Sequence, residues 1–208
     1  MTSTGATQFM GIRDEVAALK RERTISVAVE LFYDRGYENT SLDAVAERMN
    51  VTKPFIYGHF SSKAELLAEI CSRGIASALA ALDGVLTTMR GTATERLAEV
   101  SRRFVAAVLN NQRHTAIFIR EEKNLAPDDF RRISALRREF DEKLATLLKE
   151  GVATGEFTLP DANIAALAIC GMASWAYVWY RANGRLSQDQ VAVELTNLIM
   201  RMVGAKGV

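Results

Sequence analysis

The stretch Val51-Thr-Lys-Pro-Phe-Ile-Tyr-Gly-His-Phe-Ser-Ser-Lys-Ala-Glu-Leu-Leu67 decides the fold of this chain. It carries two lysines, one proline and three aromatic side chains, and no acidic residue in it precedes Glu65. Pro54 suits the first turn of a helix, where a missing N–H costs nothing, and Thr52 or Lys53 can cap that helix. The stretch therefore predicts a short helix from about residue 53 with a cationic and aromatic surface.

Outward from this stretch, apolar residues follow helical spacing. A first helix ends at Gly36, and its apolar face is formed by Ile25, Ala28, Val29 and Phe32. A second helix is capped within Thr40-Ser-Leu-Asp43 and stops at Asn50, because Asn tolerates the left-handed turn conformation. Three short helices in this order, with only a few residues between the last two, predict a helix-turn-helix.

The third helix of a helix-turn-helix lies in the major groove of DNA, so its start needs groups that bind phosphate and touch base edges. Thr52 and Lys53 can donate to phosphates or bases, and Pro54 and Phe55 offer apolar surface to a thymine methyl group. The polar and aromatic side chains that follow can reach phosphate oxygens, which fix register rather than sequence. The DNA contacts that we expect are Thr40, Ser41, Thr52, Lys53, Pro54, Phe55, Tyr57, His59 and Lys63.

The net charge of the chain gives no support to a general affinity for nucleic acid. That charge is +1, and residues 1–70 hold 8 Lys and Arg against 10 Asp and Glu. The expectation of DNA binding therefore depends on local placement. Acidic residues are absent from residues 48–64, where they would repel the phosphate backbone.

Three segments together resemble the DNA-binding domain of the TetR/AcrR transcriptional regulators. They are Ala28-Val-Glu-Leu-Phe-Tyr-Asp-Arg-Gly-Tyr37, Thr40-Ser-Leu-Asp-Ala-Val-Ala46, and Val51-Thr-Lys-Pro-Phe-Ile-Tyr-Gly-His-Phe60 followed by Lys63 and Leu66. The turn of the family usually has a glycine where this chain has Asn50. Phe55 stands where a smaller residue is common, so we expect an altered base preference.

The resemblance implies an all-α fold of about nine helices, with an N-terminal three-helix helix-turn-helix domain and a larger helical effector-binding and dimerisation domain. No strand pattern competes with the helical spacing. We expect an N-terminal tail over residues 1–18, the DNA-binding domain over 19–66 and the larger domain over 67–208. A helix capped by Ser61-Ser62 should run towards Leu82, and later helices are expected at about 94–111, 117–124, 127–151, 161–182 and 187–203.

The resemblance also implies a homodimer, because the last two helices of family members form a four-helix bundle between subunits. The sequence is compatible with this arrangement, since both segments carry apolar stripes at helical spacing and small residues that permit close helix approach. The interface residues that we expect are Leu167, Gly171, Val178, Leu195, Leu198 and Met202.

A small effector that makes the repressor release its operator is a further implication of the resemblance. The pattern Gly151-Val-Ala-Thr-Gly-Glu-Phe157, with Gly171-Met-Ala-Ser-Trp-Ala-Tyr-Val-Trp-Tyr-Arg181, is similar to a TetR subgroup that controls lipid, fatty-acid or steroid breakdown. Several members of that subgroup respond to acyl-CoA thioesters, so we expect a small hydrophobic effector such as an acyl-CoA. The pocket residues that we expect are Phe104, Phe118, Arg120, Met172, Trp175 and Trp179.

Other classes of function find less support in the sequence. The chain has only two histidines and lacks a phosphate loop, a nucleophile elbow and metal-ligand spacing, so we expect no enzyme, no catalytic or metal site and no cofactor. Residues 162–180 are uncharged and long enough to cross a bilayer, but Ala and Gly supply much of the segment, which favours a helix buried in an assembly over a membrane partner. Two alternatives stay open, a multidrug-efflux regulator of the same fold and a helical adaptor that does not bind DNA.

Cysteine usage and the N-terminus bear on localisation. Cys71 and Cys170 are far apart and form neither a disulfide framework nor a zinc spacing, so two buried thiols in a reducing cytoplasm are expected. The first residues lack the basic start and apolar run of a signal peptide. We expect a bacterial cytoplasmic protein that joins the nucleoid when it binds its operator.

Overall fold

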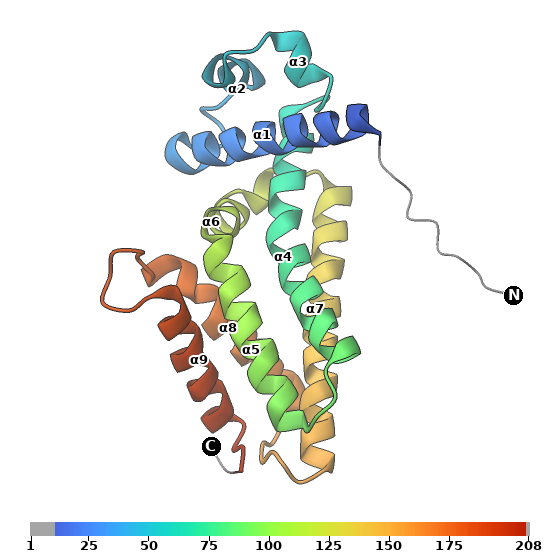
Figure 1. The fold of residues 1–208 in the computed structure, drawn as a ribbon, viewed down its shortest axis with the longest axis vertical. Coiled ribbons are helices and arrows are strands. Elements are labelled where there is room, and N and C mark those ends of the chain that lie inside the picture. Colours follow the sequence, from blue (N-terminus) through green and yellow to red (C-terminus); the bar gives the residue numbers. More distant parts are fainter. Residues whose placement is uncertain (1–10, 207–208) are drawn as a thin grey trace, which may run out of the picture. The chain divides into compact units, whose positions relative to one another are not determined.

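The computed structural model describes residues 11–206, and every regular element within them is a helix (Figure 1). The chain divides into an amino-terminal unit up to Leu66 and a carboxy-terminal unit from Leu67. The predicted all-α fold is confirmed. In chain order the elements are α1 (Ile12–Arg35), α2 (Leu42–Met49), α3 (Lys53–Tyr57), α4 (Lys63–Thr88), α5 (Ala93–Asn110), α6 (Gln112–Glu121), the 3₁₀ turn η1 (Glu122–Asn124), α7 (Pro127–Ala153), α8 (Ala162–Trp179) and α9 (Gln188–Met202).

The amino-terminal unit packs α2 and α3 beside α1 around one small apolar core (Figure 1). Side chains from all three helices are buried together there, namely Ile25, Phe32, Val45, Ile56 and Phe60. At the predicted helix end, Gly36 has a φ of 83°, a value that residues with a Cβ seldom adopt. The core that the sequence pattern predicts is therefore the one that holds the three helices.

The predicted N-terminal tail over residues 1–18 is wrong from Ile12 onward. Residues 1–10 lie outside the described residues, but α1 begins at Ile12. Asp14 and Glu15 lie in its first turn, where acidic side chains stabilise a helix by interacting with the positive end of its dipole. Good helix formers, Ala, Leu, Lys and Arg, follow them. These residues form a helix although they bury no apolar face, which is why apolar spacing did not reveal it.

The ends of α2 follow the local signals read from the sequence. The Ala44 N–H donates to Ser41 Oγ at 3.1 Å, so Ser41 is the capping residue. Asn50 closes the helix in the left-handed conformation, with φ 54° and ψ 46°, and its N–H donates back to the last turn. Ser41 therefore fixes where α2 begins, and Asn50 fixes where the turn between α2 and α3 begins.

Two predicted boundaries in the carboxy-terminal unit differ most from the structure, and the helix expected at 161–182 also ends earlier, at Trp179. The helix expected to run towards Leu82 continues to Thr88, because Val85 is buried and holds the last turns of α4 against the core. The helix expected at 117–124 begins at Gln112 instead, and its final residues form η1. Its first turn is Gln-Arg-His-Thr, which has no apolar spacing to indicate a helix.

The carboxy-terminal unit is built around α5, which packs against α7, α8 and α9. Its core is continuous across these helices and α4, and its most deeply buried members include Leu82, Leu97, Val105, Leu148 and Ile199. Burial of such side chains contributes about 1.5–3 kcal/mol each. This core fixes the walls of the cavity described below.

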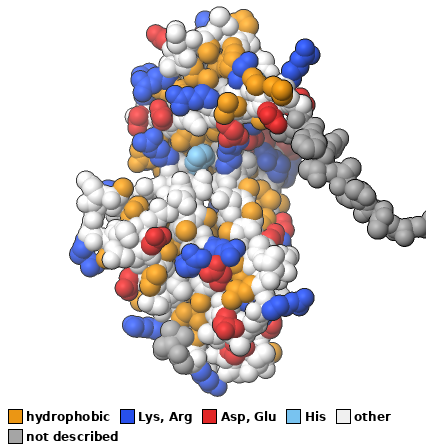
Figure 2. Space-filling view, in the orientation of Figure 1, with side chains coloured by type: hydrophobic (Ala, Val, Ile, Leu, Met, Phe, Trp, Pro, Cys, Tyr) orange, Lys and Arg blue, Asp and Glu red, His pale blue; other side chains and the backbone are white. Residues whose placement is uncertain are grey.

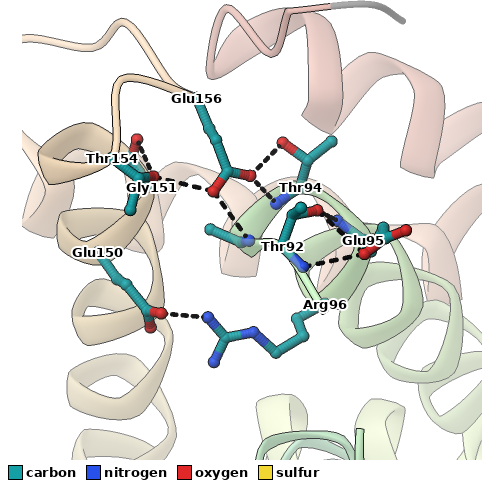
Figure 3. Close-up of polar contacts among 9 residues, drawn as sticks. Thr92, Thr94, Glu95, Arg96, Glu150, Gly151, Thr154 and Glu156 are labelled. Carbon is teal, nitrogen blue, oxygen red and sulfur yellow. Dashed lines mark hydrogen bonds and ion pairs between the residues drawn. The ribbon is translucent and has the colours of Figure 1, made fainter. Parts of the chain in front are cut away.

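A polar junction ties the end of α7 to the start of α5 (Figure 3). The Glu156 carboxylate accepts hydrogen bonds from the N–H groups of Thr94 and Ala93, at 2.8 and 3.2 Å, and from the Thr94 and Thr154 hydroxyls, at 2.8 and 2.9 Å. Thr92 and Glu95 form a capping box on the same turn. The Thr94 N–H and hydroxyl bonds, with those from Thr154 and Ala93, lower the pKa of Glu156 to about 2.

Removal of this carboxylate by Glu156→Gln should lower stability in a pH-dependent way. The folded-state pKa is below its ordinary value of 4.5, so the contribution is present above about pH 4.5 and is lost as pH falls towards 2. Thermal unfolding at pH 7 and pH 3 should show a clear deficit at pH 7 that narrows at pH 3. Glu142→Gln, at an exposed carboxylate on α7, is the control and should show no such change. An equal deficit at both pH values would contradict the role of the charge.

The last turn of α7 has no room for a side chain at Gly151. A Cβ there would lie 2.1 Å from Cδ2 of the Phe157 ring, and Phe157 is buried. The Phe157 N–H also donates to the Gly151 carbonyl at 3.0 Å, which holds the ring in place. The glycine is therefore required by the packing of the turn after α7.

Gly151→Ala should cost about 1–3 kcal/mol, because the ring must move out of a packed core. Urea unfolding measures this loss. Gly84→Ala, in the interior of α4, is the matched control, since the added Cβ meets its nearest atom at 3.6 Å. That control should be neutral or stabilising by up to about 1 kcal/mol. Equal effects of the two substitutions would refute the packing argument.

Candidate DNA-binding surface and effector cavity

The helix α3 has one buried side and one exposed side. Ile56 is fully buried and Phe60, just beyond the helix, is nearly so, which fixes α3 on the core of the amino-terminal unit. Thr52, Lys53 and Pro54 are exposed at its start, and Tyr57 is 52% exposed. Figure 2 shows basic and hydrophobic side chains next to one another on the viewed face of the surface that α1–α3 form. The exposed side of α3 thus offers groups of the kinds that bind phosphates and bases.

The cation at the start of α3 has an acidic partner within the same unit. Lys53 Nζ lies 2.5 Å from Asp43 Oδ2, and this hydrogen bond together with the negative charge of Asp43 raises the pKa of Lys53. Residues 48–64 contain no acidic residue, but the fold places Asp43 of α2 beside Lys53. Its position ten residues earlier in the chain hid this pair from sequence reasoning.

Phe55 is only half exposed, because two neighbours flank its ring. The ring of His59 packs edge-on at a centroid distance of 5.2 Å, and Lys20 Nζ of α1 lies 5.5 Å from the Phe55 centroid. The three predicted contacts Phe55, His59 and Pro54 therefore lie on one patch of the unit. Lys20 belongs to the same patch, although its position more than thirty residues before Phe55 gave no sign of this in the sequence.

Two of the predicted DNA contacts hold the unit together. Lys63 Nζ donates to the Tyr37 carbonyl at 2.9 Å and lies 4.1 Å from the Tyr37 ring centroid. That bond uses one of the three donors of the ammonium group. The prediction that Thr40 contacts DNA is corrected by the structure. Thr40 is 2% exposed, and its hydroxyl donates to the Gly36 carbonyl at 2.9 Å, so it closes the loop before α2. Ser41 remains exposed beside it.

A cavity of about 100 Å³ lies inside the carboxy-terminal unit, between α4, α5, α6, α7 and α8. Most of its wall is apolar, and the main contributors are Ile75, Ala78, Phe104, Val108, Phe118 and Ile133. His114, Arg137 and the Cys71 thiol add polar atoms. Burial, with the charges of nearby Glu121 and Glu122, raises the pKa of Cys71 to about 12, so the thiol stays protonated at neutral pH.

The cavity includes only part of the predicted effector set. Phe104 and Phe118 line it, but Arg120, Met172, Trp175 and Trp179 are not among its lining residues. Trp175 is 58% exposed on α8, and Ser174 is the residue through which α8 reaches the cavity. Helical spacing identified both tryptophans as apolar but not which side of α8 the rest of the unit covers.

The predicted dimer residues divide into exposed and buried groups. Leu167 and Gly171 are exposed on α8, as are Leu198 and Met202 on α9, and Val178 is half-buried. The prediction that Leu195 lies in the dimer interface is corrected by the structure, because Leu195 is 7% exposed and belongs to the core of its own subunit. It faces inward because α9 packs closely on α5. Two apolar faces on the last two helices are thus left uncovered within one chain.

Comparison with known protein families matches both units. A family described as bacterial regulatory proteins, tetR family, matches residues 25–70, and one described as the C-terminal domain of tetracyclin repressor-like proteins matches residues 90–203, more than half of the chain. The chain belongs to the TetR family. The TetR resemblance and the predicted function, a DNA-binding transcriptional repressor, are confirmed at the level of the family. Operator DNA, a small effector and a second subunit are the partners of such regulators.

Individual TetR-family proteins match along most of their length. The repressor KstR2 of Mycolicibacterium smegmatis is 26% identical over 189 residues, which cover 88% of this chain and 90% of KstR2. A TetR/AcrR regulator from Thermobifida fusca is 35% identical with a TM-score of 0.70, and the match covers 87% of this chain and 96% of that one. AibR, solved with isovaleryl coenzyme A and operator DNA, is 24% identical with a TM-score of 0.76, covering 89% and 99%.

Two helices in the described part of this TetR-family chain would be long and apolar enough to cross a membrane, α4 and α8. Core helices of water-soluble proteins pass the same test. Leu82 of α4 and Ala173 of α8 are buried in the carboxy-terminal unit. α4 and α8 therefore both contribute buried side chains to the carboxy-terminal unit. KstR2 and the Thermobifida fusca protein are transcriptional regulators.

The pairing of Lys53 with Asp43 predicts that Asp43 weakens the binding of DNA to the α3 surface. Asp43→Asn should tighten binding to any duplex by up to about fivefold, because the variant removes a negative charge near DNA and frees the ammonium group. Lys53→Ala should weaken binding. Fluorescence anisotropy with labelled duplexes measures both, and thermal unfolding shows whether the loss of an acid from the first turn of α2 affects stability.

The double variant Asp43→Asn/Lys53→Ala is the control for this pair. If the carboxylate acts through Lys53, Asp43→Asn should change affinity less in the Lys53→Ala background than alone. Weaker DNA binding by Asp43→Asn, with unchanged stability, would show that Asp43 does not oppose DNA binding.

Proposed function

We propose that this TetR-family regulator is a repressor that acts in the bacterial cytoplasm and releases its operator when a short acyl group, presented as a coenzyme A thioester, enters the cavity of the carboxy-terminal unit. The exposed residues of the predicted DNA-contact set, on and around α3, are proposed as its contacts with the operator. The cavity is the observation on which the proposal depends. No catalytic role is proposed.

The size of the cavity favours a small ligand. An apolar cavity of about 150 Å³ in another protein holds one benzene molecule, which has six heavy atoms. A cavity of about 100 Å³ therefore accommodates roughly four or five carbon atoms. A short or branched acyl chain has that size, whereas a steroid nucleus or a long fatty chain would need the walls to move apart.

The charge of the lining favours an anionic ligand. Arg137 is exposed at the cavity, and its guanidinium lies 5.3 Å from the Phe118 ring centroid. Arginine binds phosphate groups through paired hydrogen bonds, and coenzyme A carries several phosphates. Among residues 11–206 no Asp or Glu lines the cavity. The lining therefore offers a cationic drug no counter-charge, and Glu121 and Glu122, whose charges act on Cys71, are not among the lining residues. The multidrug-efflux alternative is less favourable for that reason.

The names of related proteins are consistent with this proposal. KstR2 is a transcriptional repressor, and AibR binds isovaleryl coenzyme A. At 24% identity AibR supports the fold alone, so the class of ligand is inferred from the cavity of this chain. The acyl group of that AibR ligand has five carbons, which is the size that the cavity admits.

A path for the response is available along α4. Cys71, Gly74, Ile75 and Ala78 of α4 form one wall of the cavity, and the same helix begins at Lys63 in the amino-terminal unit. A ligand that displaces this wall would move the segment that continues into the DNA-binding unit. In a homodimer such a movement changes the separation of the two α3 helices, which the operator spacing of about 34 Å, or a multiple, must match.

The role proposed for Arg137 gives the central test. Arg137→Ala should weaken binding of a short acyl-CoA such as isovaleryl-CoA by about 10- to 150-fold, because a charged hydrogen-bonding partner contributes about 1.5–3 kcal/mol. Isothermal titration calorimetry measures the change. Arg138→Ala, at the next exposed arginine on α7, is the matched control and should bind normally. The wild type should also release a selected operator duplex when the acyl-CoA is added.

Several ligands separate the alternatives. Butyryl-, isovaleryl- and palmitoyl-CoA should be tested beside a cationic drug on the same protein. Binding of the drug with no response to any acyl-CoA would refute the acyl-CoA proposal and support a multidrug-efflux regulator. A response to palmitoyl-CoA alone would contradict the size argument.

A further inference from the structure

The amino-terminal half of α1 is an exposed helical segment whose charges are segregated. Residues 12–24 span about 20 Å of helix. At about 100° of rotation per residue, its basic side chains fall within an arc of about 160° and its acidic side chains lie outside that arc. The basic residues are Arg13, Lys20, Arg21 and Arg23, and the acidic residues are Asp14, Glu15 and Glu22.

The basic face is turned towards α3. A shallow groove in the amino-terminal unit has Arg13, Val16, Ala17 and Lys20 of α1 on one side, with Ile12 at its end. Its other side is formed by Pro54, Phe55, Gly58 and His59. The approach of Lys20 Nζ to the Phe55 ring, at 5.5 Å, fixes the two sides relative to each other. The side chains of Arg13 and Lys20 are exposed.

The α3 surface itself is short of positive charge. Lys53 of α3 is paired with Asp43, and Lys63, which lies beyond α3, keeps its charge but has one of its three donors on the Tyr37 carbonyl. Residues 1–70 contain more acids than bases. A protein that binds duplex DNA needs cations that neutralise phosphates. The basic face of α1 supplies such cations, because it borders the same groove as Phe55 and His59.

We infer that the amino-terminal half of α1 is a second DNA-binding element, in which Arg13 and Lys20 bind the phosphate backbone beside the bases that α3 reads. The inference rests on α3 as the recognition helix. The occupant of the groove is then the sugar-phosphate strand that borders the major groove. Charge complementarity supports this occupant, since the acidic side chains of the segment lie away from the groove.

The contribution of the two cations can be measured from the salt dependence of binding. Each phosphate contact adds about 0.9 to the slope of log K against log salt concentration. Two contacts per chain make four in a homodimer, so Arg13→Ala/Lys20→Ala should lower that slope by about 3–4. Affinity should fall by a similar factor for every duplex, and the base preference should not change, because phosphates carry no sequence information.

The experiment uses the full chain and a duplex selected from a random pool. Arg35→Ala, at an exposed cation at the other end of α1, is the control for net charge and should leave the slope unchanged. Lys20→Arg keeps the charge and should bind like the wild type. Thermal unfolding should be similar for all variants, since the side chains are exposed.

The outcomes are distinguishable. If the wild type binds the duplex and Arg13→Ala/Lys20→Ala shows the wild-type slope, the role of α1 is refuted while the regulator function stands. If the slope falls equally in Arg35→Ala, the effect is general charge and the specific contact is refuted. If the wild type binds no duplex at low salt, α3 is not a recognition helix and the whole DNA-binding assignment fails.

Discussion

The burial of Ile56 and Phe60 is the constraint on which the DNA-binding surface depends. The helix α3 has only five residues, far too few to be stable alone in water. It keeps its shape because these two side chains are buried in the core of the amino-terminal unit, where α3 packs against α2. The same packing leaves Thr52, Lys53 and Tyr57 exposed. The burial of Ile56 and Phe60 therefore both stabilises the unit and exposes the proposed DNA contacts on α3.

The electrostatics of the amino-terminal unit follow from how its helices are placed. α2 brings Asp43 against Lys53, and α1 brings Lys20 against the Phe55 ring. The first contact reduces the positive charge at the start of α3, and the second places a cation next to it. A unit without an excess of basic residues can therefore still present a local cationic edge to DNA, provided that its acids lie elsewhere.

The carboxy-terminal unit shows how one core serves several purposes. α5 packs against three helices, and its first turn is held by Glu156 from the turn after α7. These attachments fix the helices around a small cavity, where Phe104 and Phe118 form apolar walls and Arg137 supplies a charge. Outside the core, α8 and α9 keep apolar faces uncovered, which is expected of a chain that associates with a second copy.

The sequence by itself determined the order of the helices, a hydroxyl cap within Thr40-Ser-Leu-Asp43, the left-handed turn at Asn50 and the helix-turn-helix. Capping and turn conformation depend on residues within a few positions of one another. Only the tertiary structure decided that Thr40 and Leu195 are buried, that Asp43 pairs with Lys53 and that α8 directs Ser174 to the cavity. Those outcomes depend on which side of a helix its neighbours cover. Helical spacing identifies an apolar face, but the packing partner of that face is set by residues far away in the chain.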